Sequence, residues 1–194
     1  HNMLPFCEEN ADILKETDIY ADYLIKYHKQ LLESISTSLI PNSKVAYKLL
    51  TSNVFTYEEK KKIISCISIN IFTESDKVAN LALVVIKNTD LKEINENTVI
   101  RIIKSASIEP YKVYIISLLI LEYNYDESKI TELLNLLGGK YTDIAERTKR
   151  PLLDKKKWNI ILAEVLKNKG FISSVKEEKD GIRIHPRKNV MDIM

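Results

Sequence analysis

Residues whose types could do chemistry are few in this sequence, and they are scattered. The three histidines, His1, His28 and His185, lie far apart, and none has a second histidine or a cysteine at the spacing of a metal site. Neither cysteine, Cys7 or Cys66, forms a recognisable pair with a histidine for nucleophilic catalysis. Within "IISCISI", Cys66 is interpreted as a small buried hydrophobe, and His28 as a partly exposed helix residue. We therefore expect neither a catalytic residue nor a metal ligand.

The distribution of glycine excludes a loop that cradles phosphate. Neither "GxxxxGK[ST]" nor "GxGxxG" occurs, and no glycine precedes residue 138. Pairs of carboxylates such as Glu58/Glu59 and Glu177/Glu178 lie in polar contexts, where helix capping or solvation explains them. The sequence thus predicts a protein that is not an enzyme and has no cofactor.

Positive charge is concentrated in the last third of the chain. The formal net charge is +2 overall, but residues 140–190 hold 14 Lys/Arg against 7 Asp/Glu, and residues 1–139 hold 15 against 19. Basic residues that could contact the phosphates of a nucleic acid therefore lie near the C-terminus. The candidates are Lys155, Lys156, Lys157, Lys167, Lys169, Arg183, His185, Arg187 and Lys188.

Residues 3–125 are predicted to form a helical array. Apolar residues recur at helical spacing, as in "YEEKKKIISCISINIF" (57–72), where four isoleucines form one stripe and three lysines lie on the solvent side. The isoleucines are Ile63, Ile64, Ile67 and Ile71, and the lysines are Lys60, Lys61 and Lys62. A helix and a turn every 15–20 residues predict an antiparallel array, either HEAT-like or irregular, with a globular bundle as the alternative.

Polar residues at the expected helix starts support this array. Thr56 with Glu59 predicts a capping box, and Thr73 with Asp76 resembles it 17 residues later. Further N-cap candidates are Asp126 and either Asn95 or Asn97.

Residues 126–190 predict a second domain that resembles a winged helix. Helices are expected at 126–139, at 140–149 with Thr142 as N-cap, and at 155–170 with Gly170 as C-cap. Strands "FISSV" (171–175) and "IRIHP" (182–186) follow, joined by a turn at Asp180-Gly181. Three helices followed by a hairpin are the order of a winged helix. The overall expectation is a mainly α protein, with an array followed by a winged-helix-like domain that has a C-terminal β-hairpin.

A winged helix has two different uses. In DNA-binding members the third helix enters the major groove, and the lysines named above would then contact phosphates. Winged helices are also common as protein-contact modules, and Asn159 and Asn168 are the only amides on the third helix that could hydrogen-bond to base edges. Both uses stay open.

The run "LLNLLGGKYTDIAERTKRPLLDKKKWNIILAEVLKNKGFISSVKEEKDGIRIHPRK" (133–188) resembles the C-terminal end of YobI-like bacterial P-loop NTPases. The features are "LLG…Y…I", a "WN…L…L…FISS" segment and a closing "IRI" strand. "EEKKKII" (58–64) is similar to the helical region that follows the NTPase domain there. The resemblance implies a nucleotide-binding domain upstream of this segment, and a helical array that senses or binds a partner.

From these features we expect a non-catalytic protein-interaction or sensing module of a larger NTPase, with nucleic-acid binding as the alternative. The partner would be another protein or the NTPase domain of the same polypeptide. The longest apolar run, "VYIISLLIL" (113–121), is too short to span a bilayer, so no membrane association is expected and the protein is predicted to be cytoplasmic.

Overall fold

The computed structural model describes residues 18–137, 152–153, 160–170 and 172–186, which form parts of two compact units, 1–107 and 108–194. The boundary predicted between residues 125 and 126 lies inside the second unit, in the connection between two of its helices, and it stays a prediction. The predicted helix at 140–149 and the first part of the one at 155–170, including Trp158, lie outside the described residues.

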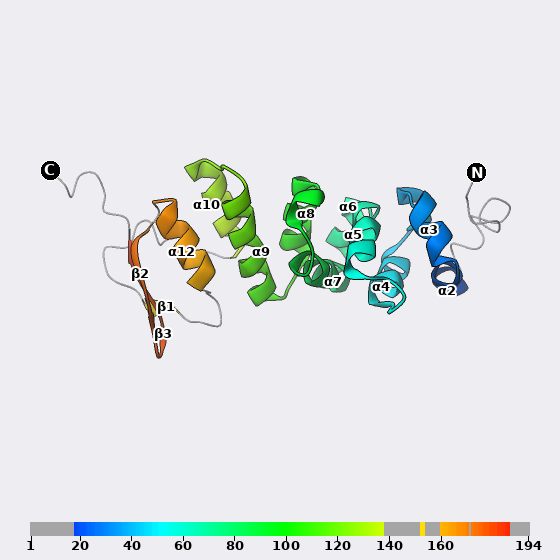
Figure 1. Cartoon of the computed structure of the whole chain (residues 1–194), viewed down its shortest axis with the longest axis horizontal. Coiled ribbons are helices and arrows are strands. Elements are labelled where there is room, and N and C mark those ends of the chain that lie inside the picture. The colour runs from blue at the N-terminus through cyan, green and yellow to red at the C-terminus, as the bar shows by residue number, and fades with distance from the viewer. Residues whose placement is uncertain (1–17, 138–151, 154–159, 171, 187–194) are drawn as a thin grey trace. The chain divides into compact units, whose positions relative to one another are not determined.

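Unit 1 is a stack of short helices in two rows. Helices α2, α4 and α7 pack in succession in one row, while in the other row α3 packs on α5 and α6 packs on α8 (Figure 1). Helices α5 and α6 both contact α7 and so join the rows. The predicted mainly α array is confirmed. Its elements are α2 (Ile19–Lys26), α3 (His28–Ser34), η1 (Thr37–Leu39), α4 (Ser43–Thr51), α5 (Tyr57–Ser65), α6 (Ile69–Glu74), α7 (Asp76–Lys87), η2 (Leu91–Glu93) and α8 (Glu96–Ser105).

The core of unit 1 lies between these rows. Ile64, Phe72, Leu83 and Ile102, from four different helices, have no exposed surface. Helices of six to twelve residues, such as α6 and α7, are marginal alone in water, and each fully buried side chain of this size stabilises the fold by about 1.5–3 kcal/mol. Packing between the rows therefore provides most of the stability of the array.

The stripe of isoleucines in residues 57–72 is divided between two helices. Helix α5 ends at Ser65, the Cys66 N–H donates to the Ile63 carbonyl at 3.0 Å, and α6 starts at Ile69. Isoleucine, serine and cysteine all have lower helix propensity than leucine or alanine, which makes "IISCISI" a weak place in a helix. The break keeps Ile67 buried while α6 turns to pack on α8 as well as α7.

The capping predictions that fall on described residues are confirmed except one, and Thr142 lies outside the described residues. Thr56 and Glu59 form the capping box, Asn95 caps α8, and Asp126 caps α10 (Glu127–Asn135). Thr73, however, lies inside α6, where its hydroxyl donates to the Ile69 carbonyl at 3.3 Å.

The N-cap of α7 is Ser75 instead, whose hydroxyl accepts from the Val78 N–H at 3.3 Å. Ser75 has an extended backbone, whereas Thr73 is still helical because α6 continues to Glu74. An N-cap must leave the helical conformation, and this requirement excludes Thr73.

The prediction that three lysines of α5 lie on the solvent side is wrong for Lys61. Its side chain is 6% exposed, and its Nζ lies 2.6 Å from Glu58 Oε2 and 2.7 Å from Glu93 Oε2. Hydrogen bonds to Glu58 and then Glu93 raise the pKa of Lys61. Because Glu93 belongs to η2, this ion cluster ties α5 to the connection between α7 and α8.

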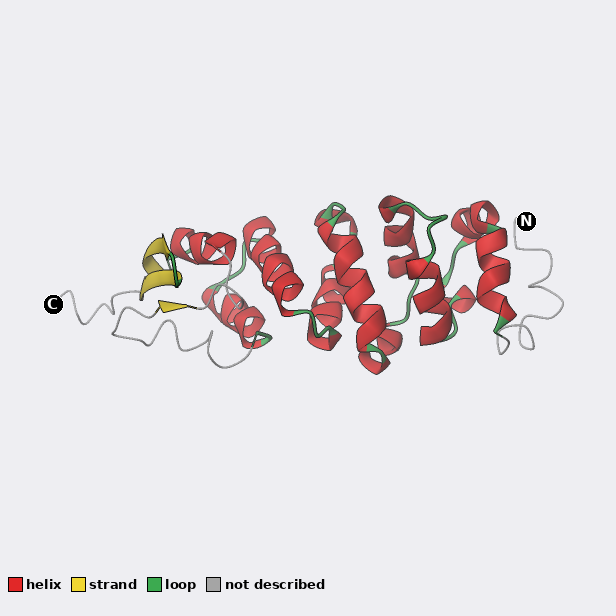
Figure 2. Cartoon of the chain, turned by 90° about the horizontal axis from the view of Figure 1, so that it is seen from below, coloured by secondary structure: helices red, strands yellow, loops and turns green. Residues whose placement is uncertain are grey.

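Unit 2 combines helices with a small sheet. Helix α12 (Ile160–Asn168) packs against both α9 (Glu109–Glu122) and β2 (Ile172–Glu178), and α10 packs on α9. Strands β2 and β3 (Gly181–Pro186) form the predicted antiparallel hairpin, and β1 (Leu152–Leu153) adds to β3 in the order β1-β3-β2 (Figure 2). The strand β1 was missed by the sequence analysis.

The boundaries of the hairpin differ slightly from the prediction. Strand β2 continues to Glu178, so the turn is Lys179-Asp180, and Gly181 already starts β3. Gly170 has a φ of +81°, which confirms it as the residue that ends α12, because glycine adopts this conformation without strain. Leu162, Leu166 and Ile182 are buried. Among the described residues, no helix is long and apolar enough to cross a membrane.

We expect Ser75→Ala to lower the free energy of unfolding by about 1 kcal/mol, because the Val78 N–H loses its acceptor. Thr73→Ala should change this free energy by less than about 0.5 kcal/mol, since Thr73 is exposed and within α6. Urea unfolding of both variants measures the difference. A larger loss for Thr73→Ala would contradict the assigned cap.

Lys61→Met should lower the free energy of unfolding at pH 7 by about 1–2 kcal/mol, because it removes the ion cluster but keeps a long side chain. The raised pKa means that the contribution of the charged lysine is present below its ordinary pKa of 10.5 and is lost as the pH rises through the raised folded value. Lys62→Met, at an exposed neighbour, is the matched control for urea unfolding. Equal losses in both variants would contradict a special role for Lys61.

Candidate functional site

The structure describes only part of the predicted basic site. Lys167 is exposed in the last turn of α12, with Nζ 3.9 Å from Glu164 Oε2, and Lys169 is exposed just beyond the helix. His185 belongs to β3. The remaining candidates lie outside the described residues, namely Lys155, Lys156, Lys157, Arg187 and Lys188.

Arg183, on β3, is held by a carboxylate of the neighbouring strand. Its Nε donates to Glu178 Oε1 at 2.8 Å, and its Nη2 donates to Glu178 Oε2 at 3.2 Å. This two-point contact raises the pKa of Arg183 and holds the pKa of Glu178 below its ordinary value. Glu178 therefore competes with any phosphate for the guanidinium group.

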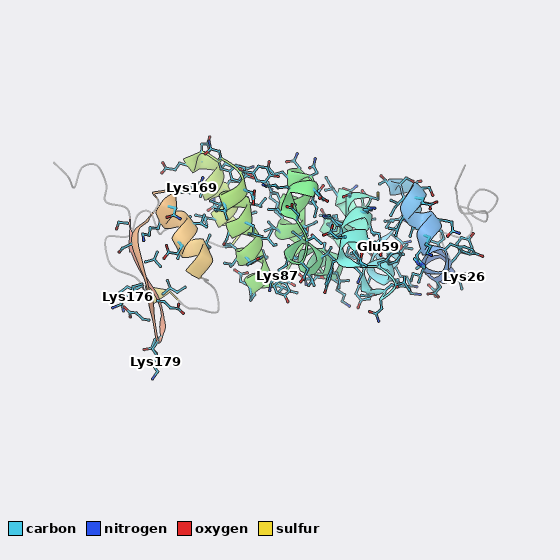
Figure 3. All side chains as sticks on the ribbon, in the orientation of Figure 1. Lys26, Glu59, Lys87, Lys169, Lys176 and Lys179 are labelled. Atoms are coloured by element: carbon cyan, nitrogen blue, oxygen red, sulfur yellow. The ribbon has the colours of Figure 1, made fainter. Side chains whose placement is uncertain are left out.

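The hairpin itself carries no net charge when His185 is neutral. Residues 172–186 contain three basic and three acidic residues, and five of the six lie in the run "KEEKD" (176–180). Lys176 lies directly opposite Arg183 in the strand register, and Lys179 lies at the tip of the hairpin, while Lys169 is near the end of α12 (Figure 3). The positive excess of residues 140–190 therefore falls mainly on residues that the structure does not describe.

Other groups that could do chemistry have structural surroundings. His28 is the first residue of α3, where its Nδ1 lies 3.2 Å from the Ile25 carbonyl and its ring meets the Phe55 ring edge-on at 6.1 Å. Cys66 is half-buried, not fully buried as predicted, and this burial raises the pKa of its thiol and so lowers its nucleophilicity. Within the described part of the chain, no three His, Cys, Asp or Glu residues gather as a metal site would require.

Sequence reasoning missed the apolar side chains that the helices leave exposed. Ile19 is 63% exposed at the start of α2, and Tyr47 is 43% exposed in the middle of α4. Leu121, near the end of α9, is 59% exposed. Lys44, Tyr47 and Lys48 lie on one face of α4. A tyrosine at helical spacing between lysines is the sequence signal that could have revealed the exposure of Tyr47. Such residues are candidates for protein contact.

Removal of Arg183 should release the carboxyl group of Glu178. We expect this group to titrate below its ordinary pKa of 4.5 in the unmodified chain, and closer to 4.5 in Arg183→Ala. A pH titration of the Glu178 side-chain carboxyl signal by NMR measures this pKa in both chains. An unchanged titration of Glu178 in Arg183→Ala would contradict the pairing.

The chain is similar to a known protein over a limited stretch of 63 residues. No model of a protein family matches the chain, and no solved structure matches it. The chain is similar to the uncharacterized membrane protein YobI of Bacillus subtilis (strain 168), with 35% identity over 63 residues. These residues are 32% of this chain and 5% of YobI, so the match spans a small part of that protein. The predicted similarity to YobI is confirmed to this extent, whereas the link to a P-loop NTPase and the winged-helix end stay predictions.

Proposed function

We propose that this chain is a non-catalytic protein-interaction or sensing module of a larger bacterial P-loop NTPase. The observation that carries the proposal is the exposure of large apolar side chains on a helical array whose core is already filled. Tyr47 lies in the middle of α4, whose buried residues include Val45, Ala46 and Leu49. The burial of those residues stabilises the helix without any contribution from Tyr47. An exposed aromatic side chain there has a use in binding a partner.

We propose that the second unit is the winged-helix-like domain of this module. Helix α12 packs on β2, and Leu162 and Leu166 of α12 and Ile182 of β3 are buried, so the hairpin has the support that an isolated two-stranded ribbon lacks. A hairpin with balanced charge, whose arginine is paired within the sheet, fits protein contact better than phosphate contact.

Nucleic-acid binding is the alternative function, and one observation favours it. Residues 140–190 hold twice as many basic as acidic residues, including the run Lys155-Lys156-Lys157. A protein that neutralises phosphates with lysines would lose affinity steeply as salt rises.

One experiment distinguishes the two functions. The tagged full chain is used as bait in a bacterial lysate, with and without nuclease, and excess untagged chain serves as the competitor. We expect at least one enriched protein that competitor displaces and that nuclease leaves in place. Enrichment that disappears with nuclease, together with salt-sensitive binding of labelled DNA that Lys155→Ala/Lys156→Ala/Lys157→Ala abolishes, would favour the alternative. If competitor displaces nothing, the proposed function is wrong.

A further inference from the structure

Helices α2, α4 and α7, which pack in succession, each carry an apolar side chain outside the stripe of buried residues. Tyr47 is 43% exposed on α4, and Ile19 is 63% exposed on α2. Leu81 and Val84 are half-buried at successive turns of α7, on the side away from its buried residues. Since α2 packs on α4 and α4 packs on α7, these side chains belong to adjacent helices of one row (Figure 1).

Lysines surround these apolar residues. Lys44 and Lys48 lie beside Tyr47 on the outward stripe of α4, three residues before it and one residue after it. Lys77 and Lys87 lie before and after the pair Leu81 and Val84 on α7. The outward stripes of α4 and α7 thus carry more lysines than acidic residues, while α2 contributes the exposed Asp18 and Asp22.

The acidic residues nearest to this surface already contact its lysines. Lys44 Nζ pairs with Asp18, and Lys48 Nζ lies 3.8 Å from Asp22 Oδ2. The Lys44 ammonium group holds the pKa of Asp18 below its ordinary value. Exposed pairs of this kind contribute little to stability, so a partner carboxylate can replace Asp18 or Asp22 at small cost.

We propose that this surface, called the α2–α4–α7 face, binds a protein segment with large apolar residues and more Asp/Glu than Lys/Arg. The inference rests on the proposed function and specifies the chemistry of the partner. Tyr47, Leu81 and Val84 supply apolar contact, and the lysines attract carboxylates and repel basic segments. In the other row, α8 exposes the polar residues Asn97, Arg101 and Lys104, and Tyr57 at the start of α5 is 45% exposed.

A displayed library of random 16-residue peptides, selected on the full chain, tests the partner chemistry without bias. We expect the enriched peptides to hold at least two large apolar residues and an excess of Asp/Glu. Fluorescence anisotropy of one synthetic representative should then show binding that weakens with salt. Tyr47→Ser and the double variant Lys77→Glu/Lys87→Glu should each weaken this binding about tenfold or more.

Two variants in the other row are matched controls. Tyr57→Ser removes a tyrosine that is 45% exposed at the start of α5, and Arg101→Glu/Lys104→Glu makes the same change of charge on α8. Circular dichroism of every variant checks the fold. Binding should be unchanged in both control variants.

Several results would overturn the inference. The inference is wrong if no peptides are enriched, if the enriched peptides lack acidic residues, or if the Tyr47→Ser and Tyr57→Ser variants bind equally. A dimer of the chain that Tyr47→Ser dissociates would also overturn it, because the face would then bind a second copy. Failure of the proposed function is recognised separately by a photo-crosslinking residue placed at Tyr47 or at Arg101 in cells. Protein cross-links from Arg101 alone would reject the face but keep the function, and cross-links from neither position would reject both.

Discussion

Burial of apolar side chains between two rows of short helices is the interaction on which the rest of unit 1 depends. Helices such as α6, with six residues, cannot persist alone in water, because nucleation of a helix is costly and few hydrogen bonds repay it. Residues such as Phe72 and Ile64 therefore fold their helices only by packing against other helices. Because the residues between the rows stabilise the fold, residues on the outward sides can differ in type without loss of the fold. Binding surfaces can therefore form on the outward sides.

Charged groups in the array divide into two kinds for the same reason. Lys61 lies beneath two carboxylates and connects α5 to η2, so its position is part of the packing. Lys44 and Lys48 contact Asp18 and Asp22 at the surface, where water screens the attraction. Only the surface lysines can exchange one carboxylate partner for another at a small cost in free energy. This difference favours the α2–α4–α7 face as a binding surface.

The hairpin of unit 2 depends on α12 in a similar way. Leu162 and Leu166 of the helix and Ile182 of β3 are buried. Arg183 donates a hydrogen bond to Glu178 of the neighbouring strand. Residues 172–186 belong to the C-terminal third that is basic overall, but their own basic and acidic residues are equal in number. They pack on α12 through β2.

By itself, the sequence determined the features that need only a few consecutive residues. The capping box of Thr56 and Glu59, the cap Asp126 and the positive φ of Gly170 follow from local geometry and were predictable. Only the tertiary structure decided the break between α5 and α6, the cap Ser75, and the partners of Lys61 and Arg183. The candidate site followed the same division, because residue counts reveal net charge but not which carboxylate lies beside which base. That choice depends on how helices and strands pack, and packing joins residues such as Lys61 and Glu93 that are far apart in the chain.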